Sequence, residues 1–453
     1  MNKIVKILNR FIQLICIVAA LISTQHVWAK TTLVNIQQEP QTHKSEDGGE
    51  VSTQLIPANK TALFENGAKY VFEVKNTTNN EQVGKVSYLV TTETGIKLKA
   101  DSINVKIAKK STGKYDFFIP ETKPGFYKVN FMINVSDYDD TTRKAFGIKP
   151  EFLASTHTKP ADFEAYWQAA KDELAKVKPQ FKVTAAPKYN TSNRYVYAIQ
   201  MQSIGNITIR GWMTVPKVVD KNKKFAVLLG LPGYQTNLEP MVGLDDDMAI
   251  ITLNVRGQGN SRDVINTRRD EFIFYHIDDK NKYVMRGVIM DCLRCIDFIC
   301  SRPELKHDKI LASGGSMGGF LAIATSSLDK RVAMCSTQNP ILCDIRGLTG
   351  KVDWPLIDIN KYIAIQPGLT IDKVFNTLDY FDTKNFASNL TCPILMGIGL
   401  LDPIAPPGNE YVAFNIIPSK RKRIMPFKDL AHEVNADYKA YEGRWMRDQF
   451  ALF

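Results

Sequence analysis

The spacing of hydrophobic and polar residues changes near residue 150. Before that point the chain consists of short runs in which apolar and polar positions alternate, separated by turns that contain Asn, Gly, Thr and Pro. Alternation with a period of two is typical of half-buried strands in an antiparallel sandwich. The predicted strands include 70–74, 85–90, 115–119 and 126–133. We therefore predict a small all-β, immunoglobulin-like sandwich domain over residues 30–150, with a partly loose polar stretch at 38–56.

The rest of the chain alternates apolar runs with helical patterns. A helix is predicted over 161–174, and the stretch 283–300 also has helical spacing. Short apolar runs that resemble buried strands lie at 225–229, 248–255, 310–312, 332–334, 394–396 and 423–425. Strands that alternate with helices indicate a mostly parallel sheet with helices on both faces. We predict an α/β domain over residues 151–453.

Residues 314–318 read Gly-Gly-Ser-Met-Gly and lie between a predicted strand and a predicted helix. In α/β-hydrolases a strained turn of this composition lifts a nucleophilic serine above the sheet, and small residues around it avoid collisions with neighbouring backbone. The pattern predicts Ser316 as a nucleophile and the α/β-hydrolase fold for this domain. On its own, the motif also fits a Gly-rich turn with an incidental serine.

The order of residues along the chain strengthens this interpretation. The acid and the histidine of an α/β-hydrolase follow the serine, and His432 is the only histidine after Ser316. His432 lies in a polar loop after a strand-like run, where it could accept the proton of the serine. Asp402 ends the apolar run 393–401, so its carboxylate could orient the imidazole. Asp382 and Asp429 are the alternative acids.

A hydrolase of this kind also needs hydrogen-bond donors for the oxyanion of its tetrahedral intermediate. One donor is expected to be the backbone N–H of Met317, which follows the nucleophile, and the other is expected from the loop 230–236 after the first strand of the sheet. Tyr234 is the predicted second donor. The alternative is that this loop is an ordinary Pro-Gly turn.

The first 29 residues have the pattern of a secretory signal peptide. Residues 1–10 are basic, 11–23 are mainly apolar, and Val27-Trp28-Ala29 offers a cleavage site of small residues. The apolar run is shorter than the roughly 20 residues that a membrane-spanning helix requires. We expect a secreted or periplasmic protein, cut after about Ala29, with no membrane span in the mature chain.

Charge and cysteine content add little to this assignment. The net charge of +11 becomes +8 without the predicted signal peptide, and the remaining basic residues are dispersed rather than interleaved with aromatic residues. No nucleic-acid partner is expected. Cys292 and Cys295 fall in a helical stretch, which is more typical of small core residues than of metal ligands, and no metal site is predicted. A disulfide among the six remaining cysteines is left open.

Several segments together resemble the acetyl xylan esterase and cephalosporin-C deacetylase group of α/β-hydrolases. The resemblance covers about residues 158–445 and is carried by 209–217, 254–259, 283–294, 314–319, 374–382, 399–407 and 432–433. The most specific parts are Arg256-Gly-Gln258 and the Leu-Asp-x-x-x-Pro-Pro pattern that begins at Leu401.

This resemblance implies a serine esterase that removes acetyl and other short acyl groups from sugars such as xylan fragments. It implies the triad Ser316, Asp402 and His432, and an oxyanion hole from Tyr234 and Met317. No metal or cofactor is required. Two positions depart from the family, which commonly has His at the position of Pro232 and Gln at the position of Met317. These changes affect the lining of the acyl pocket. Several relatives are hexamers, but the additional β domain leaves the oligomeric state of this chain open.

Two other functions are compatible with parts of the sequence. One is a serine peptidase of the prolyl oligopeptidase type, although about 120 residues are too few for the propeller of such enzymes. The other is a non-catalytic carbohydrate-binding protein with a decayed hydrolase domain, which the complete set of candidate triad residues disfavours. Whether residues 30–150 bind glycan or only pack on the enzyme is open, and packing is the favoured alternative.

Overall fold

Two sheets make up the first part of the chain, which we call the β region. In the computed structural model, which describes residues 49–220, 222–243 and 247–452, these sheets have the strand orders β1-β3-β6 and β2-β8-β7-β4-β5. The strands are β1 (Val51–Pro57), β2 (Leu63–Phe64), β3 (Ala68–Asn76), β4 (Gln82–Thr92), β5 (Lys97–Ile107), β6 (Ser111–Ile119), β7 (Gly125–Val135) and β8 (Tyr138–Ile148). All their pairings are antiparallel except that of β2 with β8.

Aromatic side chains fill the space between the two sheets. Tyr70 and Phe117, from the three-stranded sheet, lie with their ring centroids 5.0 and 5.8 Å from that of Phe131 in the five-stranded sheet. Tyr88 meets Phe117 edge to face at 5.4 Å. These rings are almost entirely buried. The alternation of the strands thus places one face of each sheet in a shared core, because successive side chains of a strand point to opposite faces.

A nine-stranded sheet forms the centre of the second part, which we call the α/β region. Its strand order is β17-β16-β15-β14-β12-β13-β11-β10-β9. The strands are β9 (Lys182–Ala185), β10 (Arg194–Ser203), β11 (Ile207–Pro216), β12 (Phe225–Leu231), β13 (Met248–Asn254), β14 (Leu305–Gly315), β15 (Met334–Gln338), β16 (Ile394–Gly399) and β17 (Lys422–Phe427). Strands β12 to β17 are parallel to their neighbours among themselves, and β9 to β11 extend the sheet in antiparallel fashion.

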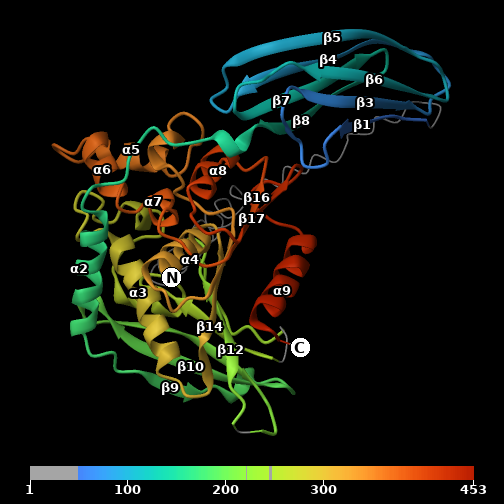
Figure 1. Ribbon diagram of the computed structural model, residues 1–453. Helices are drawn as coiled ribbons and strands as arrows, with labels where there is room; N and C mark the ends of the chain where they lie inside the picture. Colours follow the sequence, from blue (N-terminus) through green and yellow to red (C-terminus); the bar gives the residue numbers. More distant parts are fainter. Residues whose placement is uncertain (1–48, 221, 244–246, 453) are drawn as a thin grey trace, which may run out of the picture.

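Helices cover both faces of this sheet (Figure 1). They are α2 (Phe163–Lys176), α3 (Val284–Cys300), α4 (Met317–Leu328), α5 (Leu356–Ala364), α6 (Ile371–Leu378), α7 (Thr383–Ala387), α8 (Pro407–Asn415) and α9 (Ala436–Phe450). On one face, Ala226 of β12 packs in a cluster with Met446 and Phe450 of α9. Its neighbours Val227 and Leu229 belong to the larger core that contains α3 and α4. Consecutive residues of a strand therefore serve opposite layers, which explains why these strands are apolar throughout.

The structure corrects several strand predictions. Of the stretch 38–56 that was expected to be partly loose, residues 51–56 belong to β1, which pairs with β3; residues 38–48 lie outside the described part. The strand predicted at 332–334 begins only at Met334. Strand β5 was not predicted because its first half is exposed on both faces as an edge strand, so it shows no alternation. Strands β8 to β11 were also not predicted.

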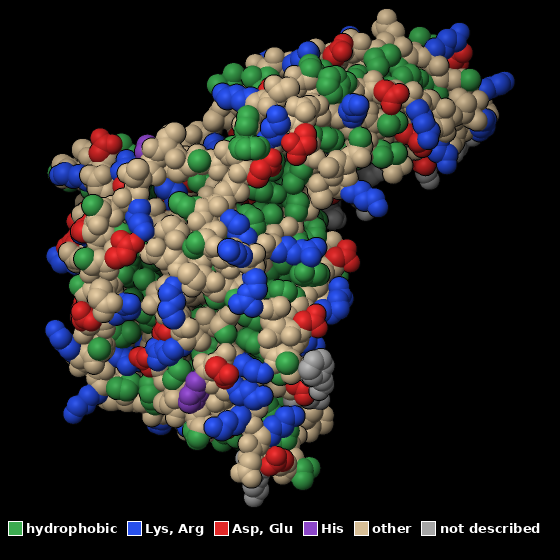
Figure 2. Space-filling view, viewed as in Figure 1, with side chains coloured by type: hydrophobic (Ala, Val, Ile, Leu, Met, Phe, Trp, Pro, Cys, Tyr) green, Lys and Arg blue, Asp and Glu red, His purple; other side chains and the backbone are tan. Residues whose placement is uncertain are grey.

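The remaining predictions concern the ends of the chain and the surface. The predicted signal peptide lies outside the described residues. None of the helices in the described part combines the length and apolar character needed to cross a membrane. Lys and Arg side chains are spread over both parts of the face seen in Figure 2, with acidic side chains among them. Within the described ranges the cysteines carry free thiols, and no cluster of three metal-ligating side chains occurs.

Candidate active site

Ser316 occupies a strained turn between β14 and α4. Its backbone has φ 58° and ψ −123°, which are unusual for a residue other than glycine. The flanking glycines are needed for close packing: a Cβ on Gly314 would lie 2.6 Å from the carbonyl carbon of Gly318, and one on Gly318 would lie 2.4 Å from the Leu231 oxygen. Helix α4 begins directly after the serine, so the turn holds Ser316 at the carboxyl end of β14.

Asp402 and His432 form a hydrogen-bonded pair at the same edge of the sheet. They follow the neighbouring strands β16 and β17, and His432 Nδ1 lies 2.6 Å from Asp402 Oδ2. The Asp402 side chain is fully buried, and its Oδ1 accepts hydrogen bonds from the backbone N–H groups of Ile404 and Ala405 at 2.7 and 2.8 Å. An ionised carboxylate only accepts, so Nδ1 donates the proton of this pair.

The other ring nitrogen of His432 is left available. Its Nε2 atom is buried, and no described residue supplies a hydrogen-bond partner for it. With Nδ1 protonated, Nε2 carries the lone pair of the neutral imidazole. A buried acceptor without a partner is costly in a folded protein, and such atoms concentrate where a ligand or a reacting group completes the bond. The pair is therefore arranged to accept a proton at Nε2.

Asn339 connects the serine turn to the Asp402 segment. It follows β15, the strand between β14 and β16. Its side-chain oxygen accepts a hydrogen bond from Gly399 N at 2.9 Å, and its own N–H donates to Gly397 O at 2.9 Å. The preceding residue, Gln338, accepts a hydrogen bond from Ser316 N at 2.8 Å. This segment was not found from the sequence, where an Asn-Pro pair after an apolar run signals only a turn.

Gly399 is a second positioning residue that the sequence reasoning missed. It ends β16, and a Cβ at this position would lie 1.8 Å from the carbonyl oxygen of Ala431 and 2.6 Å from that of Leu430. The chain that leads to His432 therefore passes directly over Gly399. The only signal in the sequence was a glycine at the end of an apolar run.

The two predicted oxyanion donors lie on neighbouring segments. Met317 is the first residue of α4, and N–H groups in the first turn of a helix have no acceptor within the helix. The loop of Tyr234 follows β12, whose Leu231 is paired with Gly314 of β14. A Cβ on Gly233 would lie 3.8 Å from Gly315 O, so this loop borders the serine turn.

The Tyr234 side chain anchors its loop. Its hydroxyl donates to Arg269 O at 3.0 Å and accepts from Ile273 N at 3.1 Å, and its ring meets that of Trp354 at 5.3 Å. Burial raises the pKa of this hydroxyl well above its usual value. The side chain is therefore neutral and structural, and the backbone N–H is the part of Tyr234 that can serve chemistry.

The structure separates Asp402 from the competing acids. Asp382 is fully buried, accepts hydrogen bonds from Asp344 N and Ile345 N at 2.9 and 2.8 Å, and pairs with Lys384 at 2.7 Å. Asp429 pairs with Lys144 of the β region at 2.6 Å. Among the three acids considered, only Asp402 bonds the histidine.

The Arg-Gly-Gln motif anchors the segment that follows β13. Arg256 forms a buried ion pair with Asp291 of α3, in which its N–H, Nε and Nη2 donate to the carboxylate at 3.0, 2.9 and 2.7 Å. A Cβ on Gly287 would lie 2.3 Å from the guanidinium, so α3 has no side chain there. The pair fixes the segment after β13 to α3, and Gln258 on this segment directs Nε2 toward Met317 Sδ at 4.0 Å.

Comparisons with known proteins identify the family of the α/β region. Residues 151–449 match the family model described as acetyl xylan esterase (AXE1). The acetyl esterase Axe7A of Xylanibacter ruminicola is 29% identical over 341 residues, which cover 72% of this chain and 75% of that protein.

Two solved structures of acetyl xylan esterases are also similar to this chain. The acetyl xylan esterase of Paenibacillus sp. R4 is 26% identical, with a TM-score of 0.60, and covers 66% of this chain and 98% of its own. Acetyl xylan esterase 1 of Thermoanaerobacterium sp. JW/SL YS485 is 25% identical, with a TM-score of 0.58, and covers 67% and 98%. The predicted α/β-hydrolase fold of the second region is confirmed. The family match leaves residues 1–150 outside it.

Proposed function

This chain belongs to the acetyl xylan esterase family and is a carboxylic ester hydrolase, and from that premise we propose that it removes acetyl groups from acetylated carbohydrates such as xylan or xylo-oligosaccharides. Membership of this family takes away the basis for the peptidase and the binding-protein alternatives. The substrate proposal is supported by the names of the relatives, which are acetyl esterases and acetyl xylan esterases.

The proposed mechanism uses Ser316, His432 and Asp402. The observation that carries it is the 2.6 Å bond between His432 Nδ1 and Asp402 Oδ2, together with the unpartnered, buried Nε2. In the proposed reaction, Nε2 takes the proton of Ser316 as the hydroxyl attacks the acetyl carbonyl, and Asp402 stabilises the resulting imidazolium. His432 then protonates the departing sugar hydroxyl. The acetyl-serine is hydrolysed by a water that His432 deprotonates, which releases acetate.

The backbone N–H groups of Tyr234 and Met317 are proposed to hold the oxyanion. Removing one such donor from a hydrolase typically costs about 3 kcal/mol of transition-state stabilisation, so two donors are a major part of the rate. Pro232 belongs to the loop of Tyr234, and the Met317 side chain is buried; both are proposed to line the acyl pocket.

The location and domain organisation are also proposals. The predicted signal peptide at 1–29 supports secretion or a periplasmic location. Residues 30–150 are proposed to be a separate immunoglobulin-like sandwich domain, followed by the catalytic domain at 151–453. The two stacked sheets with a shared aromatic core support this division. A homo-oligomer is compatible with the family.

The test is acetate release by the purified protein from acetylated xylo-oligosaccharides, with p-nitrophenyl acetate and p-nitrophenyl butyrate measured in parallel. We expect release from the oligosaccharides and from p-nitrophenyl acetate. We also expect loss of both activities in Ser316→Ala, which removes only an oxygen and should fold normally. Activity on p-nitrophenyl acetate alone would reject the sugar substrate, and near-wild-type activity of Ser316→Ala would reject the mechanism.

A further inference from the structure

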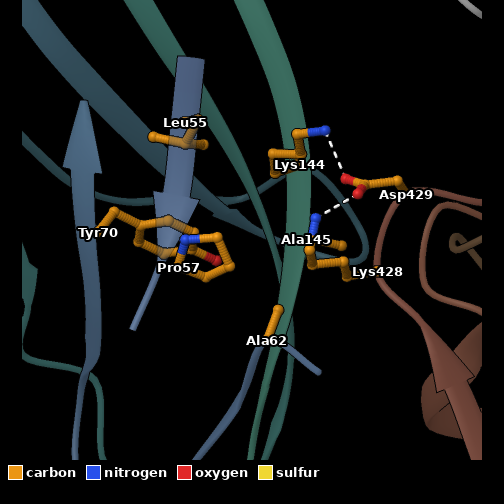
Figure 3. Close-up of a pocket in the computed structure, with 8 residues that line it drawn as sticks. All are labelled: Leu55, Pro57, Ala62, Tyr70, Lys144, Ala145, Lys428 and Asp429. Carbon is orange, nitrogen blue, oxygen red and sulfur yellow. Dashed lines mark hydrogen bonds and ion pairs between the residues drawn. The ribbon is translucent and has the colours of Figure 1, made fainter. Parts of the chain in front are cut away.

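The β region touches the loop that carries His432. Lys144 on β8 forms an ion pair with Asp429 at 2.6 Å, three residues before the histidine and 285 residues from Lys144 in sequence. Figure 3 shows the two side chains pointing toward each other across the boundary between the regions, with Lys428 bonded to the other oxygen of the Asp429 carboxylate. Asp429 is thus bonded by two lysines, one from each region.

A small cavity lies beneath this ion pair. It is lined from the β region by Leu55, Pro57, Ala62, Tyr70 and Ala145 besides Lys144, and from the other side by Lys428 and Asp429 (Figure 3). The hydroxyl of Tyr70 is buried there without a hydrogen-bond partner among the described residues, and burial together with the charge of Asp429 raises its pKa. The pKa of Asp429 is lowered overall: burial acts to raise it, but the hydrogen bonds from Lys144 and Lys428 outweigh that effect. Asp429 is therefore ionised.

The loop with Asp429 is tied to the segment of Asp402. The carbonyl oxygen of Leu430, the next residue, accepts a hydrogen bond from Leu401 N at 3.0 Å. Leu401 directly precedes Asp402. This hydrogen bond joins the loop that carries His432 to the segment that carries Asp402. A displacement of the Asp429 loop therefore acts on both members of the bonded pair.

The β region also touches the chain that follows Asp402. Glu93, in the turn between β4 and β5, pairs with Lys351 at 2.9 Å, and its carboxylate lies against Gly408, where a Cβ would approach it to 2.9 Å. The ring of Phe126 on β7 lies 5.4 Å from that of Tyr411. Gly408 and Tyr411 belong to α8, which starts five residues after Asp402. The β region thus packs on the segments that follow both β16 and β17.

We propose that the β region positions the triad through this contact, with Lys144 and Asp429 as the positioning pair that holds the His432 loop. The inference rests on the proposed roles of Asp402 and His432 in catalysis. It gives the β region a function in the reaction of the same chain, distinct from glycan binding. The pair is partly exposed, with 25% of the Lys144 side chain and 46% of the Asp429 side chain accessible, so its effect is expected on alignment rather than on overall stability.

The experiment exchanges the charges of the pair in the full-length protein. Asp429→Lys places three lysines together, and we expect kcat for p-nitrophenyl acetate to fall about tenfold with little change in KM and in the unfolding midpoint. Lys144→Glu in the Asp429→Lys background restores an ion pair of opposite polarity and should bring kcat back to within about threefold of the wild type. Lys114→Glu is the matched control: it breaks a 2.9 Å ion pair with Glu73 inside the β region, away from the boundary, and should leave kcat unchanged.

Each other outcome has a defined meaning. An Asp429→Lys variant with wild-type kcat would overturn the inference, as would a loss of kcat that the charge exchange does not restore. A rise in KM at constant kcat would also overturn it, because it would assign the pair to substrate binding. If the wild type is inactive, or if Ser316→Ala is active, the proposed function itself fails, which distinguishes that failure from a failure of the positioning role.

Discussion

Gly399→Ala tests whether the close approach of the histidine loop to the end of β16 is needed for activity. The added Cβ would lie 1.8 Å from the Ala431 carbonyl oxygen, and such contacts are essentially never shorter than 3.0 Å. The loop or the end of β16 must therefore move by at least about 1.2 Å. His432 is the next residue after Ala431, so this movement reaches the imidazole. The three atoms nearest to the new methyl group all belong to the backbone of Leu430 and Ala431, which cannot turn away as a flexible side chain would.

The expected effect follows from the size of this displacement. A misplacement of about 1 Å at a reacting group can cost about 100-fold in rate, which corresponds to about 2.7 kcal/mol of activation free energy. Overpacking of a tight site costs about 1–3 kcal/mol of stability. We therefore expect kcat/KM for p-nitrophenyl acetate to fall about 100-fold, while the free energy of unfolding falls by a few kcal/mol and the protein stays folded.

The assay combines initial rates with urea denaturation, and Gly443→Ala serves as the control. Gly443 lies on α9, where an added Cβ meets no described atom within 4 Å beyond its chain neighbours and the backbone of its own helix, so the same chemical change should leave kcat/KM as in the wild type. A second readout is the downfield proton resonance of His432 Nδ1–H, which should shift or broaden in Gly399→Ala only. A folded Gly399→Ala protein with kcat/KM within twofold of the wild type would refute the reasoning.

Two further predictions concern buried ionisable groups. Asp291→Ala leaves the guanidinium of Arg256 buried without its partner, so the free energy of unfolding should fall by about 3–5 kcal/mol in urea denaturation; a loss below 1 kcal/mol would contradict this. Glu410 on α8 is fully buried with no partner for its carboxyl oxygens among the described residues, and burial, followed by the charge of Asp402, raises its pKa. Above the ordinary carboxyl pKa of about 4.3, the unfolded state releases the Glu410 proton, whereas the folded state keeps it. The contribution of Glu410 to stability is therefore lost as the pH rises from about 4.3 toward the folded-state pKa, by up to about 1.4 kcal/mol per pH unit. The free energy of unfolding of Glu410→Gln, measured relative to the wild type, should therefore be higher at pH 8 than at pH 5. The same difference between variant and wild type at the two pH values would contradict the raised pKa.

The nucleophile turn and the histidine were accessible from the sequence because their signals are local or unique. The Gly-x-Ser-x-Gly pattern encodes the tight turn at Ser316 in five consecutive residues, and His432 is the only histidine that follows it. The change in hydrophobic spacing near residue 150 and the apolar runs from Phe225 onward likewise predicted a β region and an α/β region. These patterns report which side of each element is buried, and burial periodicity is a property of neighbouring residues.

Partners that are distant in sequence were decided only by the tertiary structure. Asp402, Asp382 and Asp429 were all candidate acids, and the order β14-β15-β16-β17 places Asp402 beside His432 while Asp382 bonds to Lys384 and the backbone near Asp344. The same holds for Gly399, whose importance depends on the chain that crosses it, and for the pair of Lys144 and Asp429. Which residues meet across such separations depends on strand order and on the packing of the two regions, because a periodic pattern states that a residue is buried but not against what.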